Sequence, residues 1–294
     1  MNLNSRPDPK AVNSGLAPVT YGTGDRPPRG DYAAARSDFT CEQQWDQYTS
    51  EDHELYRRLY ERQLAQLPGL ACEEFIGAVR HLGDPRQIPR FDALSEVLRK
   101  TTRWEIVAVP GLIPEEAFFA LLAQRRFPVT GWLRKPEEFD YVVEPDVFHD
   151  LFGHVPLLFD PGFADYMQAY GAGGLKASRL QSCQYLARLY WYTVEFGLIA
   201  TPAGLRAYGA GILSSAGELR YSVASQVPQR LGFDLKRIMR TRYKIDSYQA
   251  SYFVIDSFQQ LIEATAPDFA PYYEALSGVP ELAADDSLAT DQRY

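Results

Sequence analysis

The chain has 294 residues, of which 46% are hydrophobic and 23% are charged, and these values are ordinary for a globular protein with a large core. Its net charge of −8 argues against general nucleic-acid binding, because a phosphate backbone needs a basic surface. The three cysteines, Cys41, Cys72 and Cys183, are odd in number and unevenly spaced, so we expect reduced thiols in a cytoplasmic protein. We find no apolar run that could span a bilayer and no signal-peptide pattern, so we expect no membrane contact.

The N-terminal part begins without an apolar period. Residues 1–40 are rich in Pro, Gly, Asn, Asp and Arg, and we expect them to form a mobile tail. Three amphipathic helices follow: the first starts at residues 49–52, where Ser or Thr can cap it, and the third starts near residue 91. His53 and His81 lie in the first two helices, and we interpret both as surface or rim residues without a function.

Residues 105–143 mix strand and helix signals. A short strand is predicted at 105–109, and Pro114 stands at the first position of a following helix. Residues 127–143 combine β-forming residues with Gly131 and Pro136, so we expect short strands and a loop. Arg134 lies in that loop, where it is either a solvated surface residue or a guanidinium that binds a carboxylate.

The segment 144–159 is the centre of the sequence, because it holds His149 and His154, two of only four histidines. Imidazole is the commonest metal ligand, although two buried histidines can also just satisfy their hydrogen bonds. Residues five apart diverge by roughly 140° on a regular α-helix. We therefore expect Gly153 to end the helix in a left-handed turn and Pro156 to stop its continuation, so that His154 swings back towards His149.

A short helix is predicted at 162–170, ending at the glycine-rich residues 171–174. The longest apolar helix follows at about 178–200, and it is apolar nearly all round, which indicates a central buried helix. Glu195 is its anomaly, since its helical neighbours are aromatic or aliphatic and a buried carboxylate is costly unless it is paired or binds a metal. A salt bridge with Arg188 and a metal-ligand role both remain open.

The last third has fewer chemical signals. Gly209 and Gly211 form a lone Gly-x-Gly, which is not a dinucleotide-binding fingerprint. Ser214 either donates to a bound carboxylate or only ends a loop. A basic helix at 234–242, a strand or buried helix at 252–255 and an amphipathic helix from 258 follow. We expect residues 279–294 to fray, which leaves 41–278 as a single domain.

His149, His154 and Glu195 together supply two imidazoles and one carboxylate. This set suits a non-haem Fe(II) that activates O2. Zinc bound by two histidines and one glutamate is the chemical competitor, and it would make the protein a zinc-dependent hydrolase with Asp150 or Glu144 as general base. A metal-binding protein without catalysis is the third class.

Three segments carry a family resemblance. They read Phe-His-Asp-Leu-Phe-Gly-His-Val-Pro-Leu-Leu, Leu-Tyr-Trp-Tyr-Thr-Val-Glu-Phe-Gly-Leu and Tyr-Gly-Ala-Gly-Ile-Leu-Ser-Ser. In this order they resemble the signature segments of the tetrahydrobiopterin-dependent aromatic amino acid hydroxylases, most closely the bacterial members that act on phenylalanine. The resemblance runs from about residue 45 to 272. It implies a mainly α catalytic-domain fold with a small β-sheet, present as a free-standing, monomeric domain.

The resemblance also implies an activity and a metal centre. The reaction would be hydroxylation of L-phenylalanine to L-tyrosine by O2, with Fe(II) and tetrahydrobiopterin as cofactors. Tryptophan and tyrosine hydroxylation stay open as alternatives because the family shares these motifs, although Trp191 beside the pocket favours the smaller phenylalanine ring. The iron ligands would be His149, His154 and Glu195, with Tyr190 at the metal's edge.

Cofactor and substrate contacts follow from the same resemblance. The pterin would be bound by Gly111, Leu112, Phe118, whose ring stacks on it, and Asp150, which acts through water. The substrate would be bound by Arg134, which clamps its carboxylate and is held by Asp146, by Ser214 nearby, and by Pro145, Trp191 and Phe196 around its ring. The chain departs from animal members at Val142-Val143, where they have Thr-Pro, and at Asp150, where they have Glu.

Overall fold

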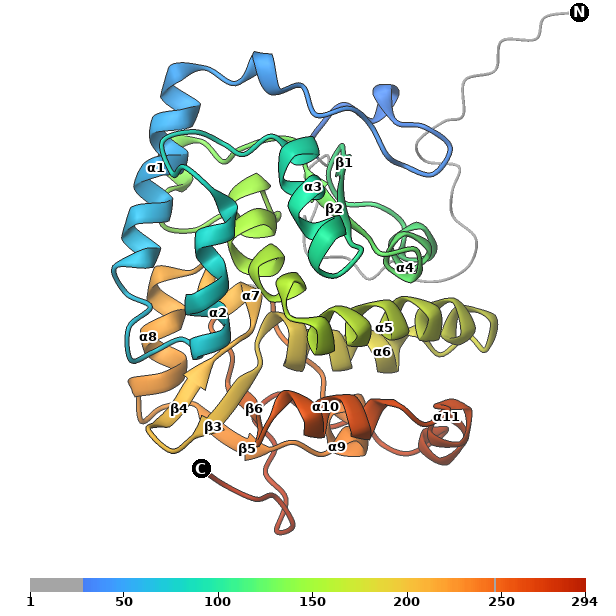
Figure 1. Ribbon diagram of the computed structural model, residues 1–294. Helices are drawn as coiled ribbons and strands as arrows, with labels where there is room; N and C mark the ends of the chain where they lie inside the picture. Colours follow the sequence, from blue (N-terminus) through green and yellow to red (C-terminus); the bar gives the residue numbers. More distant parts are fainter. Residues whose placement is uncertain (1–28, 246) are drawn as a thin grey trace, which may run out of the picture.

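The computed structural model describes residues 29–245 and 247–294 (Figure 1). Eleven α-helices of this part are α1 (Ser50–Leu64), α2 (Glu73–Ala78), α3 (Phe91–Thr101), α4 (Glu115–Ala123), α5 (Pro161–Arg179), α6 (Cys183–Tyr190), α7 (Ala210–Leu213), α8 (Ala216–Ala224), α9 (Leu235–Arg240), α10 (Phe258–Thr265) and α11 (Ala270–Leu276). Two π-helices span His149–His154 and Trp191–Glu195. The prediction of a mainly α fold is confirmed. Among the described residues, no helix combines the length and the apolar character that a membrane crossing needs.

The strands form two small sheets rather than the single one expected. They are β1 (Glu105–Val109), β2 (Arg126–Thr130), β3 (Leu198–Thr201), β4 (Gly204–Ala207), β5 (Gln229–Gly232) and β6 (Ser251–Ile255). β1 and β2 pair in parallel, with α4 as their crossover. The second sheet has the order β4-β3-β6-β5, in which only the β3–β4 pair is antiparallel. Every residue of β6 is buried, which explains its continuous apolar sequence.

The glycine-rich residues 171–174 do not end a helix, contrary to the prediction. They lie inside the 19-residue helix α5, which runs beside α4 (Figure 1). A Cβ atom on Gly174 would lie 2.1 Å from the Phe119 ring, and one on Gly171 would lie 2.4 Å from the Ala123 nitrogen. These glycines therefore permit close packing of α5 on α4. This packing outweighs the low helix propensity of glycine, so α5 continues through these residues.

The predicted long helix at 178–200 is also wrong. The chain forms α6, the π-helix Trp191–Glu195 and then strand β3. Gly197 lies where the helix gives way to the strand, and a Cβ atom there would lie 2.2 Å from the Tyr208 ring. The apolar run is buried as expected, but tertiary packing and this tight approach override its helical period.

An aromatic cluster supports the π-helix His149–His154 from behind. Phe148 and Phe152 stack on each other with ring centroids 5.1 Å apart. Tyr56 and Tyr60 of α1 contact them edge-on, at 5.8 and 5.2 Å, and Phe75 of α2 contacts Phe152. These rings are nearly or fully buried, and edge-to-face pairs of this kind favour one fixed arrangement.

Both ends of the described chain are packed, which differs from the tails expected. Residues 1–28 of the predicted tail lie outside the described residues. Within the rest, the Tyr32 hydroxyl donates to the Leu112 carbonyl at 3.0 Å. At the other end, Arg237 of α9 forms a buried ion pair with Asp291, and the Gly232 amide donates to the Gln292 carbonyl. The fraying expected for residues 279–294 is therefore not observed, because backbone and ion-pair contacts to β5 and α9 hold this segment.

Candidate active site

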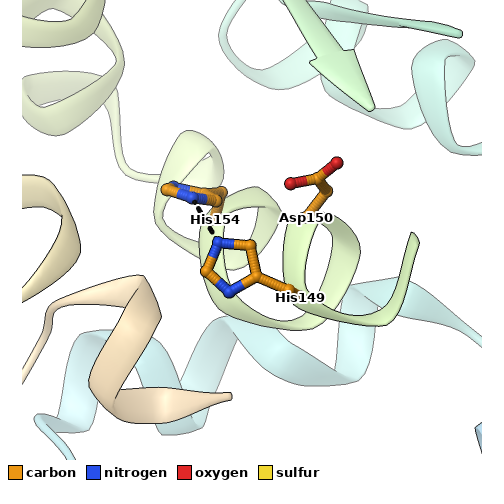
Figure 2. Close-up of side chains that lie close together, drawn as sticks. All are labelled: His149, Asp150 and His154. Atoms are coloured by element: carbon orange, nitrogen blue, oxygen red, sulfur yellow. Dashed lines mark hydrogen bonds between the residues drawn. The ribbon is translucent and has the colours of Figure 1, made fainter. Parts of the chain in front are cut away.

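A π-helix brings His149 and His154 together. In such a helix the backbone hydrogen bonds run from residue i to i+5, so residues five apart lie about one turn apart and share a face. The two Nε2 atoms are 3.2 Å apart, and the rings meet at 84° (Figure 2). The expected left-handed end at Gly153 is wrong, since this residue is inside the π-helix and has no positive φ. Gly153 instead lets α7 approach, because a Cβ atom would lie 2.8 Å from the Ala210 carbonyl oxygen.

The second π-helix brings Glu195 to the same point. Glu195 Oε1 is 3.0 Å from His154 Nε2, and Oε2 is 3.7 Å from His149 Nε2. All three side chains are largely buried, with exposed fractions of 5%, 11% and 15% for His154, Glu195 and His149. The salt bridge considered between Glu195 and Arg188 is not formed, since Arg188 pairs with Glu281 instead.

Asp150 is a second carboxylate close to the imidazoles. Its oxygen, His149 and His154 also offer atoms within 4.8 Å of one another (Figure 2). However, Asp150 Oδ2 accepts a hydrogen bond from the Thr130 amide of β2 at 2.7 Å. Glu195 directs both its oxygens at the imidazoles, so it is the better placed third ligand, and Asp150 is tied to the edge of the β1–β2 sheet.

Ser214 fixes the proton of His149. Its Oγ donates to the Ala210 carbonyl at 2.8 Å and lies 2.8 Å from His149 Nδ1. A hydroxyl has one hydrogen, so when it is given to Ala210 the hydroxyl must accept from an Nδ1–H of His149. That tautomer leaves the Nε2 lone pair free, and orienting bonds of this kind are the usual support of metal-binding imidazoles. Ser214 therefore contacts the histidine, a role that the sequence did not indicate.

Burial and charge set the protonation of these groups. Burial lowers the pKa of His149 to about 4 and raises the pKa of Asp150 to about 7. Burial opposes ionisation of Glu195 too, but the charge of His154 and its hydrogen bond hold the pKa of Glu195 below its usual range. A neutral His149 beside an ionised Glu195 is the state that can bind a divalent metal.

Two pockets meet at these residues, and they divide the predicted contacts between them. The first is lined by the expected pterin contacts Gly111, Leu112, Phe118 and Asp150, by Tyr190 and by all three candidate ligands. The second is lined by Arg134, Pro145, Trp191, Phe196 and Ser214, the expected substrate contacts other than Asp146. His149, Glu195 and Pro145 line both pockets, so a metal held here would lie where the pockets join.

Arg134 is buried rather than solvated. Its Nε and Nη2 atoms donate to the two oxygens of Asp146 at 2.8 and 2.9 Å, and Asp146 is fully buried. The guanidinium and the His149 amide, which also donates to Asp146, hold the pKa of that carboxyl below its usual range against burial. No hydrogen bond to another described residue uses Nη1, so Arg134 keeps a donor for a ligand in the second pocket.

Hydrogen bonds and stacked rings hold the aromatic wall of the second pocket. The Trp191 ring contacts the tilted Phe196 ring at 4.6 Å and stacks on Tyr243 at 4.2 Å with an interplanar angle of 12°. Its Nε1 donates to Gln249 Oε1 at 2.9 Å. Gln249 and Tyr243 could not be found from the sequence, because only the fold brings residues more than fifty positions away against Trp191.

The other two histidines make structural contacts. His53 Nδ1 accepts from the Ile88 amide at 3.2 Å, and its ring packs on Trp45. His81 is exposed and stacks on Phe159 at 4.5 Å. Neither lines one of the two pockets, so His149 and His154 are the histidines that could contribute to a metal centre there.

Two imidazoles and a carboxylate around an open position are the ligand set of non-haem Fe(II) oxygenases, here on a mainly α fold. The chain belongs to the biopterin-dependent aromatic amino acid hydroxylases, since the sequence model of that family matches residues 32–272. The family predicted from the three motifs is confirmed, and the zinc hydrolase finds no support. Phenylalanine-4-hydroxylase of Ralstonia nicotianae is 59% identical over 262 residues, covering 89% of this chain and 84% of that protein. The Chromobacterium violaceum enzyme is 58% identical, covering 87% and 86%.

Solved structures agree with this assignment. The iron- and phenylalanine-bound crystal structure of phenylalanine hydroxylase from Chromobacterium violaceum superposes with a TM-score of 0.85 at 56% identity, covering 90% of this chain and 96% of that chain. Its cobalt-bound structure superposes with a TM-score of 0.87, covering 88% and 95%. The fold class expected from the resemblance is thus confirmed over most of the chain.

Proposed function

We propose that this protein is a phenylalanine 4-monooxygenase, which converts L-phenylalanine to L-tyrosine with O2 and a reduced pterin. The observation that carries the proposal is the meeting of two pockets at His149 and Glu195. One pocket offers Phe118 and backbone for a flat heterocycle, and the other offers Arg134 and an aromatic wall for an amino acid. The iron- and phenylalanine-bound relative supports the same pairing of metal and substrate.

The residues present fit a divalent metal. Ligand atoms that bind one ion at about 2.1 Å lie about 3 Å from one another, and the Nε2–Nε2 and Nε2–Oε1 distances are 3.2 and 3.0 Å. We assign His149, His154 and Glu195 as the ligands, with Tyr190 at the edge of the site. Iron together with the reduced pterin supplies the activation of O2. The apolar, buried surroundings exclude water from that chemistry.

The second pocket orients the substrate. We assign Arg134 to the substrate carboxylate, because a charged donor already fixed by Asp146 binds a carboxylate with little loss of freedom. Trp191, Phe196 and Pro145 would surround the substrate ring, and Trp191 is held in place by its contact with Phe196 and by stacking on Tyr243. That arrangement favours the phenyl ring over indole. Ser214 acts through His149, whose tautomer it holds.

The first pocket takes the pterin. Phe118 is half-buried and meets Tyr190 edge-on at 5.7 Å, so its ring is held while part of it stays accessible for stacking. Gly111 and Leu112 supply backbone groups beside it, and the Tyr32 hydroxyl fixes the Leu112 carbonyl. Asp150 is held by the Thr130 amide and reaches the cofactor through water.

We further propose that residues 41–278 form one catalytic domain, and that the protein is a cytoplasmic monomer. The three cysteines are all free thiols, in keeping with a reducing compartment. One extended hydrophobic core runs from α1 to α11, in keeping with a single domain. Light scattering on the purified full chain measures the assembly state directly, and a mass twice that of the chain contradicts the monomer.

The test of the proposed activity is a product assay. The apoprotein is reconstituted anaerobically with Fe(II), then given L-phenylalanine, tetrahydrobiopterin and O2, and tyrosine is followed by chromatography. Tyrosine should form only when all components are present. Tryptophan and tyrosine, supplied in separate reactions, should be hydroxylated more slowly, and faster turnover of either amino acid contradicts the substrate assignment.

A further inference from the structure

Glu218 is a buried carboxylate in the second pocket, and it is neither a candidate metal ligand nor one of the assigned substrate contacts. It lies in α8, four residues after Ser214, and lines the pocket with Arg134 and Trp191. Only 6% of its surface is exposed. A carboxylate costs free energy to bury, so its place in a pocket wall needs an explanation.

Two hydrogen bonds hold one oxygen of this carboxylate. Oε1 accepts from the Gln249 amide at 3.1 Å and from the Tyr252 hydroxyl at 2.7 Å. Oε2 accepts from no described residue. The carboxylate is thus fixed through one oxygen, while the other remains available to a ligand in the pocket that Glu218 lines.

No protein cation compensates the charge of Glu218 within the described residues. Its pKa is raised to about 7 by burial, and the two opposing effects are the hydrogen bonds from Tyr252 and Gln249. The guanidinium that lines this pocket, that of Arg134, is already paired with Asp146. The charge on Glu218 therefore lacks a cationic partner that a ligand could provide.

We propose that Glu218 binds the α-ammonium group of the amino acid substrate. A zwitterionic amino acid carries one anionic and one cationic group, and the pocket offers a guanidinium and a carboxylate from separate elements. The inference rests on the proposed function, since it names how the substrate pocket recognises the amino group. It also explains why this pocket contains a buried acid that is neither a candidate metal ligand, as Glu195 is, nor paired with an arginine, as Asp140 is. The Gln249 backbone amide donates to Glu218, and its side-chain oxygen accepts from Trp191. Gln249 therefore links the residue proposed to bind the ammonium group to a residue assigned to the substrate ring.

The test compares two ligands that differ only in the amino group. L-phenylalanine and 3-phenylpropanoate share the ring and the carboxylate. Their dissociation constants are measured by calorimetry under argon on the Fe(II)-loaded full chain, for wild type and for Glu218→Gln. The matched control is Glu144→Gln, the same change at another buried acid, which does not line the second pocket.

The amino group should account for the whole effect of Glu218→Gln. L-phenylalanine should bind about 10- to 100-fold more weakly, the size of a lost charged hydrogen bond, while 3-phenylpropanoate should bind within about twofold of wild type. Glu144→Gln should change neither value. Equal weakening of both ligands overturns the proposal, because it means that Glu218 only supports the pocket wall. Unchanged binding of both ligands overturns it too, because it means that Glu218 does not contact the substrate.

Two further measurements keep the outcome clear. If thermal melting shows that Glu218→Gln does not fold, Glu218→Asp replaces it, because aspartate keeps the charge but withdraws the carboxylate by one methylene. This variant should again weaken the binding of L-phenylalanine selectively. Equal effects on L-phenylalanine and 3-phenylpropanoate refute the proposal. Tyrosine formation by wild type is measured in parallel. If wild type forms tyrosine but the Glu218 variant does not selectively weaken L-phenylalanine, only the ammonium contact is refuted. If the variant selectively weakens L-phenylalanine but wild type forms no tyrosine, only the proposed reaction is refuted.

Discussion

His149 Nδ1 and Ser214 Oγ lie 2.8 Å apart, and this contact determines which nitrogen of the imidazole can bind a metal. We predict that Ser214→Ala weakens iron binding roughly 10- to 100-fold, because the support that holds His149 in its metal-binding tautomer is lost. Iron affinity is measured by competition with a chelator. The control is Ser215→Ala, which removes the N-cap of α8 and should cost about 1 kcal/mol of stability without changing iron affinity. Equal iron affinity in wild type and Ser214→Ala contradicts the orienting role.

Glu195 and Asp150, the two carboxylates near the imidazoles, should have different functions. Glu195→Ala should abolish stoichiometric iron binding, because its oxygens lie against both imidazoles. Asp150→Asn should retain iron, because that side chain is tied to the Thr130 amide, but it should raise the apparent KM for the pterin. Metal analysis of both variants after anaerobic loading decides the point. Full iron in Glu195→Ala together with loss of iron in Asp150→Asn means that Asp150 is the third ligand.

Arg134→Ala should raise the KM for L-phenylalanine far more than that for the pterin. Loss of charged hydrogen bonds costs about 1.5–3 kcal/mol, which corresponds to roughly 10- to 150-fold. The variant also leaves Asp146 buried without its partner, so a loss of about 3–5 kcal/mol in stability is expected. Arg237→Ala is the matched control, since it breaks the buried pair with Asp291 outside both pockets. Arg237→Ala should lose a similar free energy of unfolding, and its KM values should be unchanged. If Arg134→Ala raises the KM values for L-phenylalanine and the pterin equally, Arg134 has a structural role only.

Glu218 should make the stability of the protein fall with rising pH. Burial raises its pKa in the folded protein from 4.5 to about 7, so between these values the folded state binds more protons than the unfolded state. The contribution is fully present below about pH 4.5 and is lost as the pH rises through about 7, amounting to at most about 3 kcal/mol. Glu218→Gln should flatten this part of the profile, measured as unfolding free energy in urea from pH 4.5 to 8. A variant profile parallel to that of wild type means that Glu218 does not titrate there.

The sequence indicated which residues form the candidate metal site, but it did not indicate the backbone geometry that brings them together. His149, His154 and Glu195 stood out because charged and imidazole side chains are rare in apolar segments. The regular helix period, however, placed the histidines about 140° apart, and only a π-helix, which has no clear sequence signature, puts them on one face. The same limitation explains the error at 178–200, where a second π-helix and a strand replaced a continuous helix.

Contacts between distant segments could not be predicted from the sequence. Gly171 and Gly174 read as a helix end because glycine disfavours helices, yet packing against α4 outweighs that preference. Residues 279–294 lack an apolar period, and they are held instead by the backbone of β5 and by Arg237. Glu218 and Gln249 were missed for the same reason, since their role depends on partners that the fold brings to them.

A comparison of iron and zinc in the same site tests whether His149, His154 and Glu195 form a catalytic iron centre. Apoprotein from a single preparation is loaded with Fe(II) or Zn(II), and tyrosine formed per pterin oxidised is measured for each. Zinc is bound by the same ligand types but has no redox chemistry, so we expect near-stoichiometric tyrosine with iron and none with zinc. Added zinc should inhibit the iron form. Tyrosine formation by the zinc form, or pterin oxidation that does not depend on Fe(II), would contradict the assignment of His149, His154 and Glu195 to a catalytic iron centre.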